Sequence, residues 1–145
     1  MKAIAMSMVL FAGMAAATAH AQVHPRVFRD PGPGAGATAV GTASGTVPVS
    51  ARLAGCRGYI VETNDFEITL DRARPNLRLR TDSTKDLVLL VQLPDGSYRC
   101  DDDSGGENQP EINIVTPPLG TYRVWIGVYA PGVIADYSFR MSSDT

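Results

Sequence analysis

The sequence GTYRVWIGVY, residues 120–129, decides the fold class, because its large apolar side chains recur at every second position. Tyr122, Val124 and Ile126 alternate with residues such as Arg123, which is the pattern of a strand with one buried face. An amphipathic helix would instead repeat its apolar residues every three or four positions. This stretch therefore predicts a β-strand.

The same alternation recurs on both sides of this stretch. It is present at residues 66–70, 77–80 and 137–141, and residues 87–93 are apolar throughout except for Gln92. A continuous apolar run predicts a central strand that is covered on both faces. Turns that contain proline and glycine separate these runs. Seven or eight short strands in about 95 residues predict a single all-β domain, an antiparallel β-sandwich.

The first 48 residues have a different composition from the rest. Residues 1–21 combine Lys2, a run of small apolar residues and an Ala-His-Ala cleavage site at 19–21, which predicts a secretory signal peptide. The protein is then expected to be secreted or periplasmic and to have no membrane anchor. Residues 22–48 are rich in Pro, Gly, Ala, Thr and Ser, which predicts a flexible leader that cannot bury enough surface to order itself. The folded domain is expected at 49–145.

The charge of the chain excludes one class of partner. It has 13 basic and 15 acidic residues, a net charge of -2, and the arginines are scattered. This distribution argues against nucleic acid as a partner. We expect a monomer that binds an unidentified extracellular protein or glycan.

The two cysteines, Cys56 and Cys100, predict one disulfide bond. An even number of cysteines in an oxidising compartment favours this pairing, and two separate thiols are the alternative. Closing a loop of roughly 40 residues stabilises the folded state by about 4 kcal/mol in the chain-entropy model.

The acidic stretch CDDDSGGENQP, residues 100–110, carries most of the chemistry in the sequence. Its Asp-Ser-Gly-Gly core at 103–106 matches the nucleophile motif of chymotrypsin-like serine peptidases, with Ser104 as the nucleophile. A general base must lie within hydrogen-bond distance of that serine, and His24, in the predicted leader, is the only histidine left after cleavage. We therefore predict that the protein is not an enzyme.

A calcium site is a second interpretation of the acidic stretch. Three adjacent carboxylates repel one another, and a hard cation with six to eight oxygen ligands relieves this repulsion. The candidate ligands are Asp101, Asp103 and Asn108, with Asp86 or Asp95 from neighbouring loops. The alternative is a solvated turn whose aspartates accept hydrogen bonds from the local backbone and which Cys100 ties to Cys56. No cofactor is required under either interpretation.

A candidate ligand patch lies on the second face of the strand at 120–129. Arg123, Trp125 and Tyr129 alternate with its apolar residues and together could bind a glycan or a peptide. The alternative is that both faces of this strand are covered by the fold.

The order of four motifs resembles the bacterial pre-peptidase C-terminal domain family. These motifs are Asp-Leu at 86–87, Pro-Asp-Gly at 94–96, the acidic stretch ending in Asn-Gln-Pro at 108–110, and GTYRVWI at 120–126. The resemblance covers about residues 50–143. It implies a small, jelly-roll-like β-sandwich of a secreted protein, and similar folds serve as collagen-binding modules of secreted collagenases. Residues 55–59 together with the acidic stretch also resemble short, stand-alone secreted bacterial proteins.

One position departs from the family pattern. The family often has a second acidic residue two positions before Asp86, where this chain has Thr84, so a calcium site implied by the family starts with one ligand fewer. The resemblance implies a secreted, non-catalytic binding module that calcium could stabilise. The alternative is a purely structural protein of the cell envelope without a specific ligand.

Overall fold

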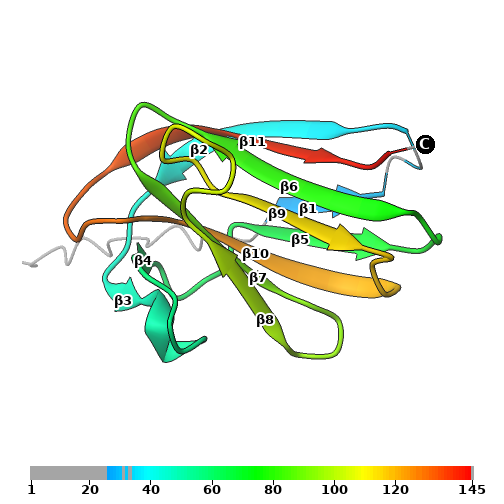
Figure 1. The fold of residues 1–145 in the computed structure, drawn as a ribbon, viewed down its shortest axis with the longest axis horizontal. Coiled ribbons are helices and arrows are strands. Elements are labelled where there is room, and N and C mark those ends of the chain that lie inside the picture. The colour runs from blue at the N-terminus through cyan, green and yellow to red at the C-terminus, as the bar shows by residue number, and fades with distance from the viewer. Residues whose placement is uncertain (1–25, 31, 33, 145) are drawn as a thin grey trace, which may run out of the picture.

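The computed structural model describes residues 26–30, 32 and 34–144, and the predicted signal peptide and His24 lie outside this part of the chain. The elements are β1 (Arg26–Arg29), β2 (Ala37–Ala43), β3 (Val47–Pro48), the short 3-10 helix η1 (Val49–Ala51), β4 (Tyr59–Ile60), β5 (Phe66–Leu70), β6 (Asn76–Asp82), β7 (Leu87–Gln92), β8 (Tyr98–Asp101), β9 (Glu111–Val115), β10 (Gly120–Val128) and β11 (Ala135–Ser142) (Figure 1).

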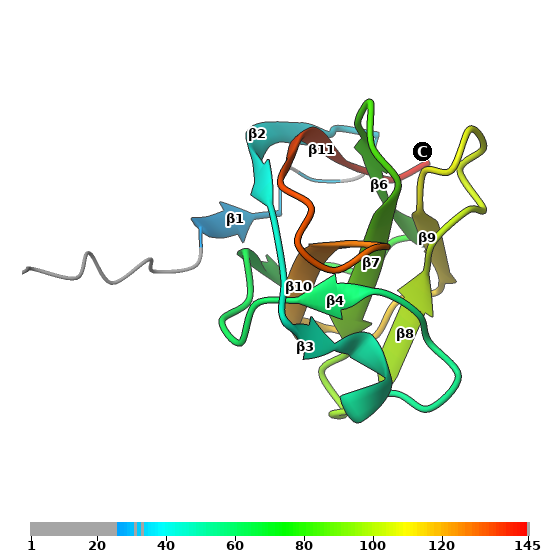
Figure 2. The ribbon, with the colours of Figure 1, turned by 90° about the vertical axis from the view of Figure 1, so that its left-hand side faces the viewer.

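The strands form two sheets that pack face to face, so the predicted all-β sandwich is confirmed. The seven-stranded sheet has the order β1-β5-β10-β4-β3, with β7 paired to β10 and β8 paired to β7. The four-stranded sheet has the order β2-β11-β6-β9. Figure 2 shows β1 and β2 on the same side of the sandwich, as the outer strands of the two sheets.

The long strand β10 organises the seven-stranded sheet. Its first half pairs with β5, and Arg123 to Val128 pair with β7. Tyr122, Val124 and Ile126 point into the space between the sheets and are buried, as the alternation in the sequence predicts. The main core forms between the sheets, where the rings of Phe66 and Phe139 stack with their centroids 4.6 Å apart.

Strand β7 is buried on both faces, as its continuous apolar sequence predicts. Leu87, Leu89 and Val91 belong to the main core, whereas Val88 and Leu90 pack into a second cluster on the outer side of the sheet.

This second cluster is covered by residues 47–60, which we call the flap. The flap contributes Val49, Cys56 and Ile60, and the cluster also contains Trp125 of β10. The disulfide between Cys56 and Cys100 of β8 joins the flap to the sheet, with the two Cα atoms 6.2 Å apart. This pairing confirms the prediction from the cysteine count, and it closes the outer side of the seven-stranded sheet.

The prediction of a flexible leader at residues 22–48 is wrong for the part that the structure describes. Strand β1 runs parallel to β5, and β2 pairs along its whole length with β11. Phe28 packs against Phe66 and Phe139, with ring centroids 5.1 and 6.0 Å apart. Small residues suffice in β2 because the aromatic rings of its neighbours fill the core, so composition alone misjudged this segment.

A buried ion pair also anchors the segment between β1 and β2. Arg74, just before β6, pairs with Asp30, and both side chains are almost completely buried. The Asp30 carboxylate also accepts a hydrogen bond from the Gly32 amide at 2.8 Å. Two charges removed from water require such close pairing, so this contact holds the N-terminal segment against the domain.

No helix in the described part of the chain is long and apolar enough to cross a membrane.

Candidate functional site

The acidic loop after β8 is a hydrogen-bonded turn built around Asp101. Its Oδ1 accepts a hydrogen bond from the Ser104 hydroxyl at 2.5 Å, and its Oδ2 accepts bonds from the amides of Ser104 and Glu111, both at 2.9 Å. Both carboxylate oxygens are therefore engaged by the loop and by the start of β9. This is the arrangement expected for the structural interpretation of the loop.

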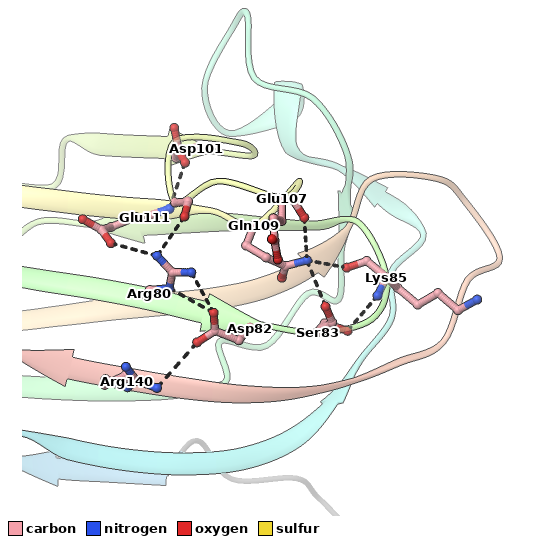
Figure 3. Close-up of polar contacts among 10 residues, drawn as sticks. Arg80, Asp82, Ser83, Lys85, Asp101, Glu107, Gln109, Glu111 and Arg140 are labelled. Carbon is pink, nitrogen blue, oxygen red and sulfur yellow. Dashed lines mark hydrogen bonds and ion pairs between the residues drawn. The ribbon is translucent and has the colours of Figure 1, made fainter.

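Gln109 and Arg80 fasten the same loop to the turn that joins β6 to β7. The buried Gln109 side chain donates from Nε2 to the carbonyls of Ser83 and Lys85, each at 3.1 Å. Arg80 donates from Nη1 to the Gly105 carbonyl at 2.8 Å. Figure 3 shows the Gln109 side chain pointing at the backbone of Ser83 and Lys85, and it shows Arg80 further along β6, beside Asp82 and Glu111. The loop is thus fixed on one side by Gln109 and on the other by the disulfide.

Ion pairs cover the outer face of the four-stranded sheet beside this loop. Arg80 pairs with Asp82 at 2.9 Å and with Glu111 at 3.5 Å, and Arg140 lies 3.8 Å from Asp82 (Figure 3). Hydrogen bonds and charge from Asp82 and Glu111 raise the pKa of Arg80. These exposed pairs set the charge pattern of the sheet and contribute little stability.

Ser104 lacks the surroundings of a catalytic nucleophile. Its hydroxyl donates to Asp101, and the described residues include no histidine that could accept its proton. A carboxylate that also orders two backbone amides of its own loop is not arranged as the base that activates a serine.

The four predicted calcium ligands are not brought together as one set. Asp101 is engaged by its own loop, and Asn108 is exposed with a positive φ of 58°. Asp86 instead lies near Asp102 and Asp103, since burial and then these two charges raise its pKa. Within the residues the structure describes, no group of three or more His, Cys, Asp or Glu side chains is placed to hold a metal ion.

The charge of Asp102 and Asp103 faces Arg57 of the flap. The hydrogen bond from Arg57 to the Tyr129 hydroxyl, followed by the charge of Asp102, raises the pKa of Arg57. The flap therefore supplies a cation next to the acidic loop.

The predicted ligand patch is wrong at Trp125. This side chain is only 4% exposed and packs under the flap, and its Nε1 donates to the Glu62 carbonyl at 3.2 Å. Arg123 is exposed and bonds Gln92 and Glu67 at 3.2 and 3.4 Å. The alternation in the sequence identified the second face of β10 correctly, but the flap covers this face at Trp125, whereas Arg123 is exposed and Tyr129 is partly exposed.

A cavity of about 580 Å³ lies on the open side of the sandwich, between β1, β2 and the loop from β4 to β5. Its lining consists of Arg26, Gly41, Thr42, residues 61–65 and Tyr137. It combines apolar walls with a carboxylate, a guanidinium and a phenol, which is the composition of a typical ligand pocket.

Asp65 is the titratable group of this cavity. Burial raises its pKa from 3.8 to about 6, although the Ile126 amide, the charge of Arg26 and its own amide all act in the opposite direction. Its Oδ2 accepts the hydrogen bond from Ile126 at 2.8 Å. A carboxylate has about four lone-pair sites, so Asp65 keeps capacity to accept further donors.

Arg26 bridges the two sheets at the mouth of the cavity. It donates from Nη1 to the Val40 carbonyl at 2.7 Å and from Nη2 to the Tyr137 hydroxyl at 3.2 Å. Its guanidinium lies 4.6 Å from the centre of the Phe66 ring, within the range of a cation–π contact. Burial raises the pKa of Tyr137 to about 12, so its phenol is neutral at physiological pH.

Gly41 makes room for this arrangement. A Cβ atom at this position would lie 2.5 Å from the Tyr137 hydroxyl oxygen and 2.9 Å from Nη2 of Arg26. Any larger residue would push Tyr137 or Arg26 into the cavity.

Sequence reasoning did not identify Arg26, Asp65 or Tyr137 as site residues. Arg26 lay in the predicted leader, Asp65 simply precedes an alternating strand, and Tyr137 read only as a core residue. These positions share no motif, because two separate strands, β1 and β11, and the loop between β4 and β5 bring them together.

The fold and the cavity define a single-domain, disulfide-bonded β-sandwich with a pocket at its open side. No family model matches the chain, and no curated protein matches it. Solved structures are similar to it, among them the following two. One is the pre-peptidase C-terminal domain of a collagenase from Bacillus anthracis, with a TM-score of 0.47, 16% identity, and coverage of 82% of this chain and 95% of that one. The other is PliG, a periplasmic inhibitor of g-type lysozyme from Aeromonas hydrophila, with a TM-score of 0.44, 14% identity, and coverage of 82% and 98%. The first is a domain of the family that the sequence resembles.

Proposed function

We propose that this protein is a secreted, non-catalytic β-sandwich module that binds an extracellular or envelope ligand in the cavity of Arg26, Asp65 and Tyr137. The observation that carries the proposal is the partly buried carboxyl of Asp65, which faces this cavity with a pKa raised to about 6. Burying a carboxylate without a strong partner destabilises the folded protein. Such a group in a pocket is a recognised indication of a functional site.

The chemistry of the cavity favours binding over catalysis. Asp65 accepts hydrogen bonds, Arg26 donates them, and the neutral Tyr137 phenol does both. These groups can orient a ligand, but the lining includes no nucleophile paired with a base.

Chemical-shift mapping by NMR tests the proposal with five small probes: N-methylacetamide, glycerol, glucose, n-butylamine and acetate. We expect at least one probe to shift the amide signals of residues 61–65 and of Gly41. Asp65→Asn should weaken that binding by about tenfold, because the carboxylate charge and its acceptor strength are lost. Asp71→Asn, which changes an exposed carboxylate, serves as the matched control.

If no probe shifts the cavity signals at millimolar concentration, the cavity is not a ligand site and the structural alternative takes its place. Equal weakening by Asp65→Asn and Asp71→Asn would also contradict the proposal. The non-catalytic part has a separate test, covalent labelling by an active-serine phosphonate. We expect wild type and Ser104→Ala to remain equally unlabelled.

A further inference from the structure

The outer strands of the two sheets differ in how they are protected against pairing with another chain. An exposed strand edge is normally guarded by a charge, a proline or shortness. Four outer strands of the described chain carry such guards: β1 has Arg26 and Arg29, β3 has two residues including Pro48, β8 has Arg99 and Asp101, and β9 has Glu111. Strand β2 has the sequence ATAVGTA over seven residues and carries none of these guards.

The free edge of β2 presents the backbone of Thr38, Val40 and Thr42. The Ser83 hydroxyl bonds the Asp136 carbonyl from the β6 side of β11, so the alternate residues of β11, beginning with Tyr137, direct their backbone groups toward β2. Their partners in β2 are the residues that alternate with Thr38, Val40 and Thr42. Arg26 reaches the Val40 carbonyl from the open side of the sandwich, in agreement with this orientation.

Arg26 does not close this edge to a partner. A carbonyl oxygen has two lone pairs, and Arg26 uses one of those on Val40. The Val40 side chain is 72% exposed and uncharged, so it does not guard the edge against pairing.

We propose that β2 pairs antiparallel with β2 of a second copy of this chain, so that the two four-stranded sheets join into one continuous sheet. A two-fold axis beside Val40 pairs it with Val40 of the second copy, and it pairs Thr38 with Thr42 of the second copy. Both are favourable cross-strand pairs, and a symmetric dimer of this kind is the commonest form of assembly.

The charges beside the seam favour the antiparallel arrangement. On the exposed face of β11, Arg140 lies opposite Thr38 and Asp136 lies opposite Thr42. The two-fold axis therefore places Arg140 in the same row as Asp136 of the second copy. A parallel seam would instead align each charge with its own kind. The proposal goes beyond the ligand cavity and replaces the monomer that the sequence predicts.

Sedimentation equilibrium of the purified protein over a range of concentrations tests the dimer. We expect a reversible monomer–dimer equilibrium that Val40→Lys weakens by about tenfold or more, because a charge then faces its own copy across the seam. Val115→Lys is the matched control: Val115 is also 72% exposed and ends β9, the other outer strand of the same sheet. Circular dichroism checks that both variants are folded.

Hydrogen exchange gives a second measurement that a monomer cannot reproduce. The amides of Thr38, Val40 and Thr42 should exchange more slowly as the protein concentration rises, and those of β9 should not change. A protein that stays monomeric at high micromolar concentration would overturn the proposal. Equal effects of Val40→Lys and Val115→Lys would overturn it as well.

Discussion

At the scale of single residues, Asp65 places an ionisable carboxyl in the lining of the cavity at a cost in folding stability. Its carboxyl orders the β10 backbone through Ile126, yet burial disfavours the ionised form that predominates at neutral pH. A hydrophobic residue would pack this position without that electrostatic penalty. The Asp65 carboxylate instead combines the hydrogen bond from the Ile126 amide with a polar group in the lining of the cavity.

The pH dependence of stability follows from this residue. Because the folded pKa of about 6 lies above the ordinary value of 3.8, the folded state binds the proton more tightly. The stability gained from the protonated carboxyl is fully present below about pH 4 and is lost as the pH rises through about 6. Between pH 4 and 7, wild type should lose about 2.5 kcal/mol relative to Asp65→Asn in urea unfolding. Asp71→Asn should follow wild type, and parallel curves for wild type and Asp65→Asn would contradict the assignment.

The charge of Asp101, in contrast, stabilises the backbone of its own loop. It accepts three hydrogen bonds from Ser104 and Glu111, so both of its oxygens are engaged by the loop and by the start of β9. Glu107 and Asn108, with φ of 54° and 58°, complete the turn in the left-handed region.

This geometry makes a prediction about calcium. We expect the melting temperature in millimolar calcium to equal that in EDTA, because within the described residues no group of three or more acidic side chains is placed to hold a metal ion. Differential scanning fluorimetry measures this directly. A stabilising shift that Asp103→Ala abolishes and Asp71→Ala leaves intact would contradict this expectation and support the predicted calcium site.

At the scale of elements, the sequence predicts the strands that alternate between large apolar and polar residues. In β5, β6, β10 and β11 apolar residues recur at every second position, and β7 is recognisable by its continuous apolar run. Strand β2 could not be predicted in this way, because its inward residues are alanine and glycine and the rings that cover them lie far along the chain. Hydrophobic periodicity identifies strands whose own large apolar side chains form the core, and it misses strands with small inward residues that other strands cover.

The same distinction explains the candidate sites. The disulfide and the acidic loop are local or carry distinctive residues, so the sequence identifies them. The cavity depends on β1 lying beside β5 and on Gly41 lying over Tyr137, and these are long-range pairings. The burial of Trp125 depends in turn on a flap that only the fold places over it.

The ion pair between Asp30 and Arg74 anchors the N-terminal segment to the chain just before β6. Asp30→Ala and Arg74→Met should each lower the free energy of unfolding by about 3 to 5 kcal/mol, since each leaves a buried charge without its partner. The double variant should lose much less than the sum of the two. The exposed pair of Asp71 and Arg72 is the control, and its removal should change stability by less than about 1 kcal/mol. Strictly additive losses at Asp30 and Arg74 would argue against a direct pair.

At the scale of the whole molecule, the protein consists of three layers that enclose two hydrophobic cores. The four-stranded sheet covers the main core, the seven-stranded sheet separates the two cores, and the flap covers the second (Figure 2). Because β7 and β10 contribute to both cores, a substitution that destabilises one core should also destabilise the other. The folded unit therefore extends from β1 to β11, beyond the domain of 49–145 that the sequence predicts.

Truncation tests this boundary. A chain that begins at Arg26 should unfold in one cooperative transition with the melting temperature of the full chain. A chain that begins at Val49 should lack the near-ultraviolet circular dichroism of a packed core, because removing β1 and β2 exposes Phe66 and Phe139 and leaves β11 as an unpaired edge. A chain that begins at Ala37 lacks only β1 and should fold with reduced stability. Cooperative unfolding of the chain from Val49 with an unchanged melting temperature would show that β1 and β2 are not part of the folding unit.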